Sequence, residues 1–129
     1  TSRKATSWRS TRPGRSSARF PRGVSGEPTF VVLMRVHLHF PEVGSLKGKR
    51  AELNRVKAHL RERCGATVAE VAHQDTWQRS TLAVAVTGGS PGRVAEVADG
   101  VQRLLDARFP QGVRVERRVA SWDDLESLR

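Results

Sequence analysis

Residues 30–40 read FVVLMRVHLHF, a stretch rich in β-branched and aromatic side chains. Every second residue of its later part is apolar, and the residues between them include Arg35, His37 and His39. This alternation has the period of a β-strand with one buried face. We therefore predict a strand over residues 30–40 that carries Arg35, His37 and His39 on its more polar face.

Two helices are expected after this strand. Ser45 is a good N-cap for a helix that runs to about Cys64, and Gly65 is a suitable residue to end it. Ser90 caps a second helix, which ends before Pro110. Apolar residues recur at helical spacing in both segments, at Leu46, Leu53, Val56, Leu60 and Cys64 in the first and at Val94, Val97, Ala98, Val101, Leu104 and Leu105 in the second.

Three further strands complete the pattern. Residues 67–75 and 79–87 form two of them, with a tight turn between, and Val113, Val115 and Val119 mark the last. The order β-α-β-β-α-β predicts an α+β fold on the ferredoxin-like βαββαβ plan, a four-stranded antiparallel sheet with two helices on one face. The opposite face of the sheet would then carry no helix.

The chain of 129 residues suits one domain, which we place at residues 29–120. Residues 121–129 form a C-terminal tail, in which Ser121 and Asp124 make a weak capping box that would add a helical turn. Residues 1–28 are rich in Ser, Thr, Arg, Gly and Pro without apolar period, so we predict a disordered basic extension. Three interpretations of it stay open: a basic arm for nucleic acid, a transit peptide, or a passive segment upstream of the true start.

Charge and cysteine content limit the function classes. The net charge is +10, and more than half of it lies in residues 1–28, a balance that favours nucleic acid, acidic proteins or anionic surfaces as partners. No apolar run is long enough to span a membrane, and no secretory signal is visible. The single cysteine, Cys64, rules out an intrachain disulfide and a zinc site built on several thiolates. We expect a cytoplasmic protein with no cofactor and no bound metal.

The first helix carries a basic stripe. Lys47, Arg50, Asn54, Lys57 and Arg61 are spaced three or four residues apart and so share one face, while Lys49 adds another charge near the helix start. Basic side chains next to the free amides of a helix N-terminus suit phosphate. The candidate phosphate or nucleic-acid site is therefore Lys47, Lys49, Arg50, Lys57 and Arg61, and the ordinary alternative is a solvated helix face.

The turn between the two central hairpin strands is a second candidate. Its polar and aromatic residues are His73, Gln74, Asp75, Trp77, Gln78 and Arg79. An exposed tryptophan ring could stack on a base, with glutamine and arginine side chains reading the base edge. Alternatively, Trp77 covers one end of the sheet while Asp75 and Arg79 fix the turn.

The third candidate lies on the bare sheet face, where Arg35, His37 and His39 are expected side by side with Arg114 and Arg118. Two histidines two residues apart could hold a metal, but no carboxylate with suitable ligand spacing accompanies them. Half-exposed strand residues are the simpler interpretation.

No sequence motif of a known catalytic site is present. The sharpest enzyme hypothesis is hydrolysis of a phosphate ester or acyl phosphate, with the first helix N-terminus holding phosphate and His73 or Asp75 orienting water. Nothing in the sequence sets that geometry, so we name no catalytic residue and favour a protein that is not an enzyme.

Three segments together resemble the YlxP-like family, the bacterial domain of unknown function 503: SLKGKR at 45–50, AEVAHQDTWQR at 69–79 and LAVAV at 82–86. The resemblance covers roughly residues 30–120 and implies a ferredoxin-like fold in a bacterial cytoplasmic protein. Family members are often encoded beside translation factors, which implies RNA or the ribosome as partner. Family members often carry an acidic residue where this chain has Ala72. They also usually begin close to the first strand, which favours the interpretation of residues 1–28 as a segment upstream of the true start.

We therefore predict a small cytoplasmic binding protein, associated with RNA or the ribosome, that uses the basic face of its first helix and the tip of its central hairpin. The alternative is a protein–protein interaction module that acts as a homodimer through its sheet face or a strand edge.

Overall fold

The structure is a computed structural model that describes residues 27–41, 44–76 and 78–128. The predicted disordered extension, apart from Glu27 and Pro28, lies outside the described residues, and so does Trp77 of the hairpin candidate. Of the predictions made for these two segments, the structure therefore tests none.

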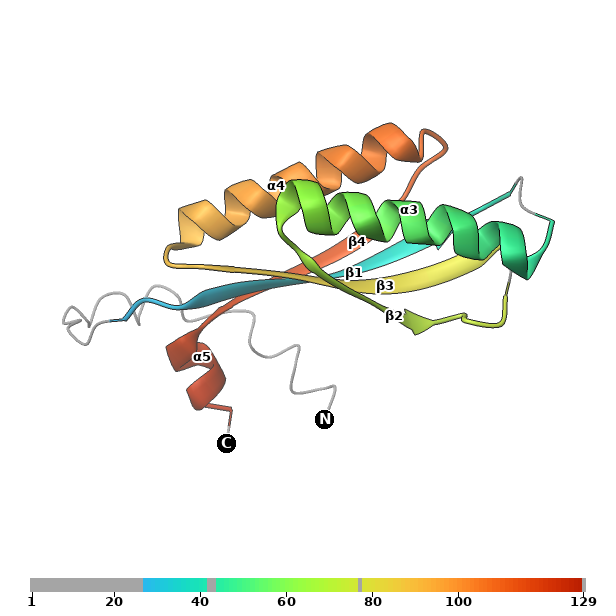
Figure 1. Cartoon of the computed structure of the whole chain (residues 1–129). Helices are drawn as coiled ribbons and strands as arrows, with labels where there is room; N and C mark the ends of the chain where they lie inside the picture. The colour runs from blue at the N-terminus through green and yellow to red at the C-terminus, as the bar shows by residue number, and fades with distance from the viewer. Residues whose placement is uncertain (1–26, 42–43, 77, 129) are drawn as a thin grey trace.

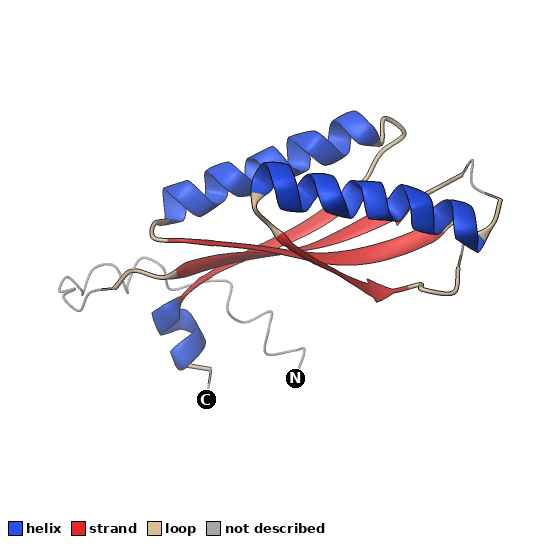
Figure 2. Cartoon of the chain, in the orientation of Figure 1, coloured by secondary structure: helices blue, strands red, loops and turns tan. Residues whose placement is uncertain are grey.

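Four strands form one antiparallel sheet in the order β2-β3-β1-β4, with the two long helices layered over one face (Figures 1 and 2). The elements in chain order are β1 (Phe30–His39), α3 (Leu46–Cys64), β2 (Thr67–Ala72), β3 (Arg79–Gly88), α4 (Pro91–Arg108), β4 (Arg114–Ser121) and α5 (Trp122–Glu126). The predicted α+β ferredoxin-like βαββαβ fold is confirmed.

β1 lies in the middle of the sheet, paired with β3 on one side and β4 on the other. Its alternate residues Val32, Met34, Val36 and Leu38 are buried beneath α3 and α4 together with Val84 of β3 and other apolar residues. The residues between them face the opposite side, which we call the open face. The alternation seen in the sequence therefore decides which β1 side chains reach the core.

Both predicted helix starts and the first helix stop are confirmed. The Ser45 side chain accepts a hydrogen bond from the Gly48 amide, and the Ser90 side chain accepts one from the Arg93 amide. Gly65 has φ +66°, a left-handed conformation that ends α3 and costs glycine little. These caps satisfy amides and carbonyls that have no partner inside the helix.

One predicted boundary and one predicted core residue are corrected. β2 ends at Ala72 instead of residue 75, because the pairing with β3 shifts between Glu70 and Ala72 and because His73 has a positive φ of 65°. Both features turn the chain out of the sheet. Leu46, predicted to begin the apolar stripe of the first helix, is 39% exposed.

The open face is not entirely bare. The short helix α5 lies on that side of the sheet, opposite α3 and α4 (Figure 1). It begins with the predicted capping box, in which the Ser121 side chain accepts from the Asp124 amide and Asp124 accepts from the Ser121 amide. The C-terminal tail is therefore an ordered part of the domain in residues 121–128.

Within the part of the chain that the structure describes, no helix has both the length and the apolar character required to cross a membrane.

Candidate functional site

Lys49 is the most deeply buried charged residue near the candidate sites, with 1% of its side chain exposed. Its Nζ donates hydrogen bonds to the carbonyl oxygens of His73, at 2.5 Å, and Thr76, at 2.6 Å. The same nitrogen lies 3.4 Å from the Glu70 carboxylate, which also accepts from the Ser80 hydroxyl. Three acceptors thus match the three protons of the ammonium group.

This burial corrects the prediction that Lys49 belongs to an exposed phosphate site. Lys49 precedes Leu53 by four residues and points into the protein with it, so the ammonium group meets the β2–β3 turn and not solvent. The hydrogen bonds of the Lys49 ammonium group tie the start of α3 to the β2–β3 turn. Two candidate sites that the sequence presents separately are therefore neighbours.

The β2–β3 turn, of which residues 73–76 and 78 are described, is held by backbone and side-chain groups. The Thr76 amide donates to the His73 carbonyl at 3.2 Å, and the Arg79 guanidinium lies 3.3 Å from Nε2 of His73. Gln74 and Asp75 are exposed at the tip. The turn therefore presents amide and carboxylate groups to solvent beside the first turn of α3.

The basic side chains of α3 form what we call the outer flank, consisting of Lys47, Arg50, Lys57 and Arg61. Lys47, Arg50 and Arg61 are exposed and Lys57 is half-buried. Arg61 also donates to the Val68 carbonyl on the edge strand β2, at 3.3 Å. No ion pair between described residues involves any of the four, and the first turn of α3 contains no acidic residue. The charges of Lys47 and Arg50 therefore add to the positive end of the helix dipole.

On the other flank of α3, Glu52 pairs with two arginines. The Glu52 carboxylate lies 2.8 Å from Arg55 on the same helix and 3.2 Å from Arg108 on α4. The hydrogen bond from Arg55, helped by the charge of Arg108, lowers the pKa of Glu52 below its ordinary value. The Glu52 carboxylate therefore offsets positive charge on this side of α3, which does not happen on the outer flank.

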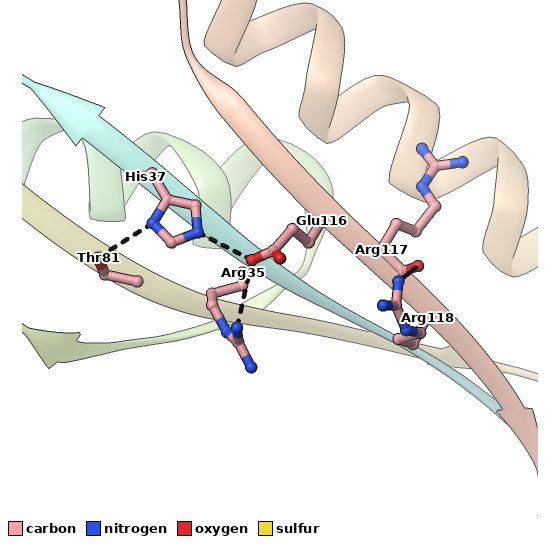
Figure 3. Close-up of polar contacts among 6 residues, drawn as sticks. All are labelled: Arg35, His37, Thr81, Glu116, Arg117 and Arg118. Atoms are coloured by element: carbon pink, nitrogen blue, oxygen red, sulfur yellow. Dashed lines mark hydrogen bonds and ion pairs between the residues drawn. The ribbon is translucent and has the colours of Figure 1, made fainter. Parts of the chain in front are cut away.

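The open face carries a polar network centred on Glu116, which the sequence analysis did not select (Figure 3). Glu116 Oε1 lies 2.9 Å from Nε2 of His37 and 3.3 Å from Nη1 of Arg35, and Nδ1 of His37 lies 3.4 Å from the Thr81 hydroxyl. Glu116 is opposite Arg35 in the β1–β4 pairing. Its position between Arg114 and Arg118, at strand spacing, is the sequence signal that places it on this face.

The geometry of this network bears on metal binding and on nucleophilic catalysis. Both ring nitrogens of His37 already face partners, and no cluster of three potential metal ligands exists among the described residues. Thr81, His37 and Glu116 follow the order hydroxyl, imidazole, carboxylate, but Thr81 is only 4% exposed, so its oxygen is inaccessible to a substrate. The arrangement suits charge compensation within the sheet.

Acidification should remove the contribution of Glu116 to stability. The hydrogen bond with His37, together with the charge of Arg35, lowers the pKa of Glu116 below 4.5. A carboxyl whose pKa is lower in the folded than in the unfolded state stabilises the fold above the unfolded value, and this effect disappears as pH falls through the folded value. Urea unfolding should therefore show Glu116→Gln to be less stable than the wild type at pH 7, with the difference in free energy of unfolding shrinking as the pH falls below 4.5. A difference of constant size would contradict this assignment.

Comparisons with known proteins find a matching family model, a similar bacterial protein and a structural likeness. A family model described as "Protein of unknown function (DUF503)" matches residues 31–118. The uncharacterized protein YlxP of Bacillus subtilis is 31% identical over 78 residues, which cover 60% of this chain and 80% of that protein. A de novo designed protein, Foldit4, is 13% identical, with a TM-score of 0.48 over 71% of this chain and 96% of its own.

Proposed function

This chain belongs to the DUF503 family of proteins of unknown function, so we propose a function from the chemistry of its surface. We propose that it is a small, cytoplasmic, non-enzymatic protein that binds RNA, either free or in the ribosome. The binding surface consists of the outer flank of α3 and the adjacent β2–β3 turn. The observation that carries the proposal is the set of basic side chains on the outer flank that no described acidic residue neutralises.

The length of the outer flank suits a phosphate backbone. From Lys47 to Arg61 the helix rises about 20 Å, at 1.5 Å per residue. A nucleic-acid strand carries one negative charge per nucleotide, so several phosphates can meet this stripe at once. The free amides at the start of α3 favour an anion at the same end.

The turn would supply the contacts that are not purely electrostatic. Gln74 and Gln78 carry side-chain amides that can donate to and accept from the edges of unpaired bases. Gln74 is exposed and Gln78 is half-buried, and the buried Lys49 holds their turn against the helix. Rigid placement of the turn beside the outer flank would let one RNA segment contact both.

A homodimer through the open face is the second candidate. It is favoured by three exposed apolar side chains on β1 and α5: Leu33 at 40%, Trp122 at 60% and Leu125 at 39%. Such a dimer would bury the side of the sheet opposite α3, so it leaves the outer flank accessible. Light scattering of the full chain distinguishes a dimer from a monomer independently of RNA binding.

Salt dependence tests the RNA-binding proposal. Retention of single-stranded RNA and of ribosomal subunits by the full chain should fall steeply with salt, with a slope of about −3 or steeper in log affinity against log salt for four phosphate contacts. Binding that is absent at low salt, or that does not change with salt, would contradict the proposal.

A further inference from the structure

A groove with a volume of about 490 Å³ lies between α3 and α4, on the flank of α3 away from the proposed RNA surface. The two helices run next to each other over the sheet (Figure 1). The groove is lined by His59 and Arg63 from α3 and by Arg103, Leu104, Ala107 and Arg108 from α4. It is a shallow hollow that is largely open to solvent.

The polar groups of this groove are hydrogen-bond donors. Nη1 of Arg108 lies 3.3 Å from Nδ1 of His59, and because a guanidinium only donates, Nδ1 must accept. A neutral His59 ring then carries its proton on Nε2, which makes that nitrogen a donor as well. The lining therefore combines three guanidinium groups and one imidazole N–H without a carboxylate.

The positive charge in the groove is only partly compensated. Glu52 pairs with Arg108 at 3.2 Å, but Arg63 and Arg103 form no ion pair with any residue that the structure describes. Their field reaches Cys64, where burial raises the pKa of the thiol while both arginines oppose that rise. An anion between them would relieve the repulsion and accept paired hydrogen bonds.

We propose that this groove binds a phosphomonoester of the class of nucleoside monophosphates, whose base offers a flat ring face to the apolar side chains of the groove. The phosphate lies between Arg63 and Arg103, whose planar guanidinium groups match its oxygens. Leu104 and Ala107 provide the apolar surface for the remainder of the ligand. The site is separate from the outer flank, so this proposal does not depend on RNA binding.

Calorimetric titration of the full chain at low salt tests the proposal, with adenosine monophosphate, adenosine and inorganic phosphate as probes. We expect adenosine monophosphate to bind and adenosine not to bind. The variant Arg63→Gln/Arg103→Gln should weaken binding at least about tenfold, since it removes both charged donors that face the phosphate. The matched control Arg93→Gln/Arg118→Gln, which removes the same charge outside the groove, should bind as the wild type does.

Three results would overturn the site: no binding of adenosine monophosphate at millimolar concentration, unchanged binding by the groove variant, or an equal loss in the matched control. If inorganic phosphate binds as tightly as adenosine monophosphate, the claim that Leu104 and Ala107 contact the nucleoside is wrong. Lys47→Glu/Arg50→Glu should retain nucleotide binding, which separates a failure of this site from a failure of the RNA proposal.

Discussion

Lys49→Met is expected to lower the free energy of unfolding by about 3–5 kcal/mol, because it removes one partner of a buried ion pair. Methionine keeps most of the apolar stem of the side chain but removes the ammonium group. The Glu70 carboxylate, whose side chain is 10% exposed, would lose its charge partner. The carbonyl oxygens of His73 and Thr76 would also lose a donor.

Equilibrium urea unfolding at pH 7 measures this effect. Lys47→Met is the matched control: it deletes the same charge two residues away on the exposed side of α3, and should change stability by no more than about 0.5 kcal/mol. Glu70→Gln combined with Lys49→Met should recover part of the loss, because the buried charge is then absent. A loss below about 1 kcal/mol for Lys49→Met would show that the ammonium does not hold the turn.

Much of the fold follows from local sequence patterns. The alternation in residues 30–40 places β1 correctly, since a strand with one buried face requires a period of two. Ser45, Gly65 and Ser90 mark helix ends because each satisfies or permits a specific backbone geometry. The end of β2 was predicted incorrectly, because the register shift near Ala72 depends on pairing with β3 and leaves no local signature.

The candidate site was less predictable, because its contacts join residues that are distant in the chain. Lys49 stands where the apolar stripe of α3 should continue, four residues before Leu53, but a charged residue at such a position is ordinarily expected to face solvent. Its burial is explained by the turn carbonyls, 24 and 27 residues away in the sequence, and by the Glu70 carboxylate. Strand pairing likewise places Glu116 beside His37, although the two residues are 79 positions apart in the sequence.

Charge reversal on the outer flank should have the largest effect on binding. Lys47→Glu/Arg50→Glu replaces two attractions to phosphate with two repulsions, at the end of α3 where the helix dipole also favours an anion. We expect RNA affinity at low salt to fall by at least about tenfold, and the salt slope to become shallower by about 1.4. Both residues are exposed, so the fold should remain intact.

The matched control is Arg93→Glu/Arg118→Glu, which changes the net charge equally but places the reversals at the start of α4 and on the open face. All proteins retain residues 1–28, so any contribution of that basic segment to RNA binding is common to the comparison. The control should stay within about threefold of the wild type, since only phosphate contacts that are actually made contribute to the slope.

The central claim, that the outer flank of α3 is the RNA-binding surface, is tested most directly by measuring RNA affinity across a salt series for the wild type and these two double variants. The account predicts weaker affinity and a shallower slope for Lys47→Glu/Arg50→Glu alone. Equal losses in both variants would show that net charge is sufficient, and an unaffected Lys47→Glu/Arg50→Glu would show that RNA does not contact this flank.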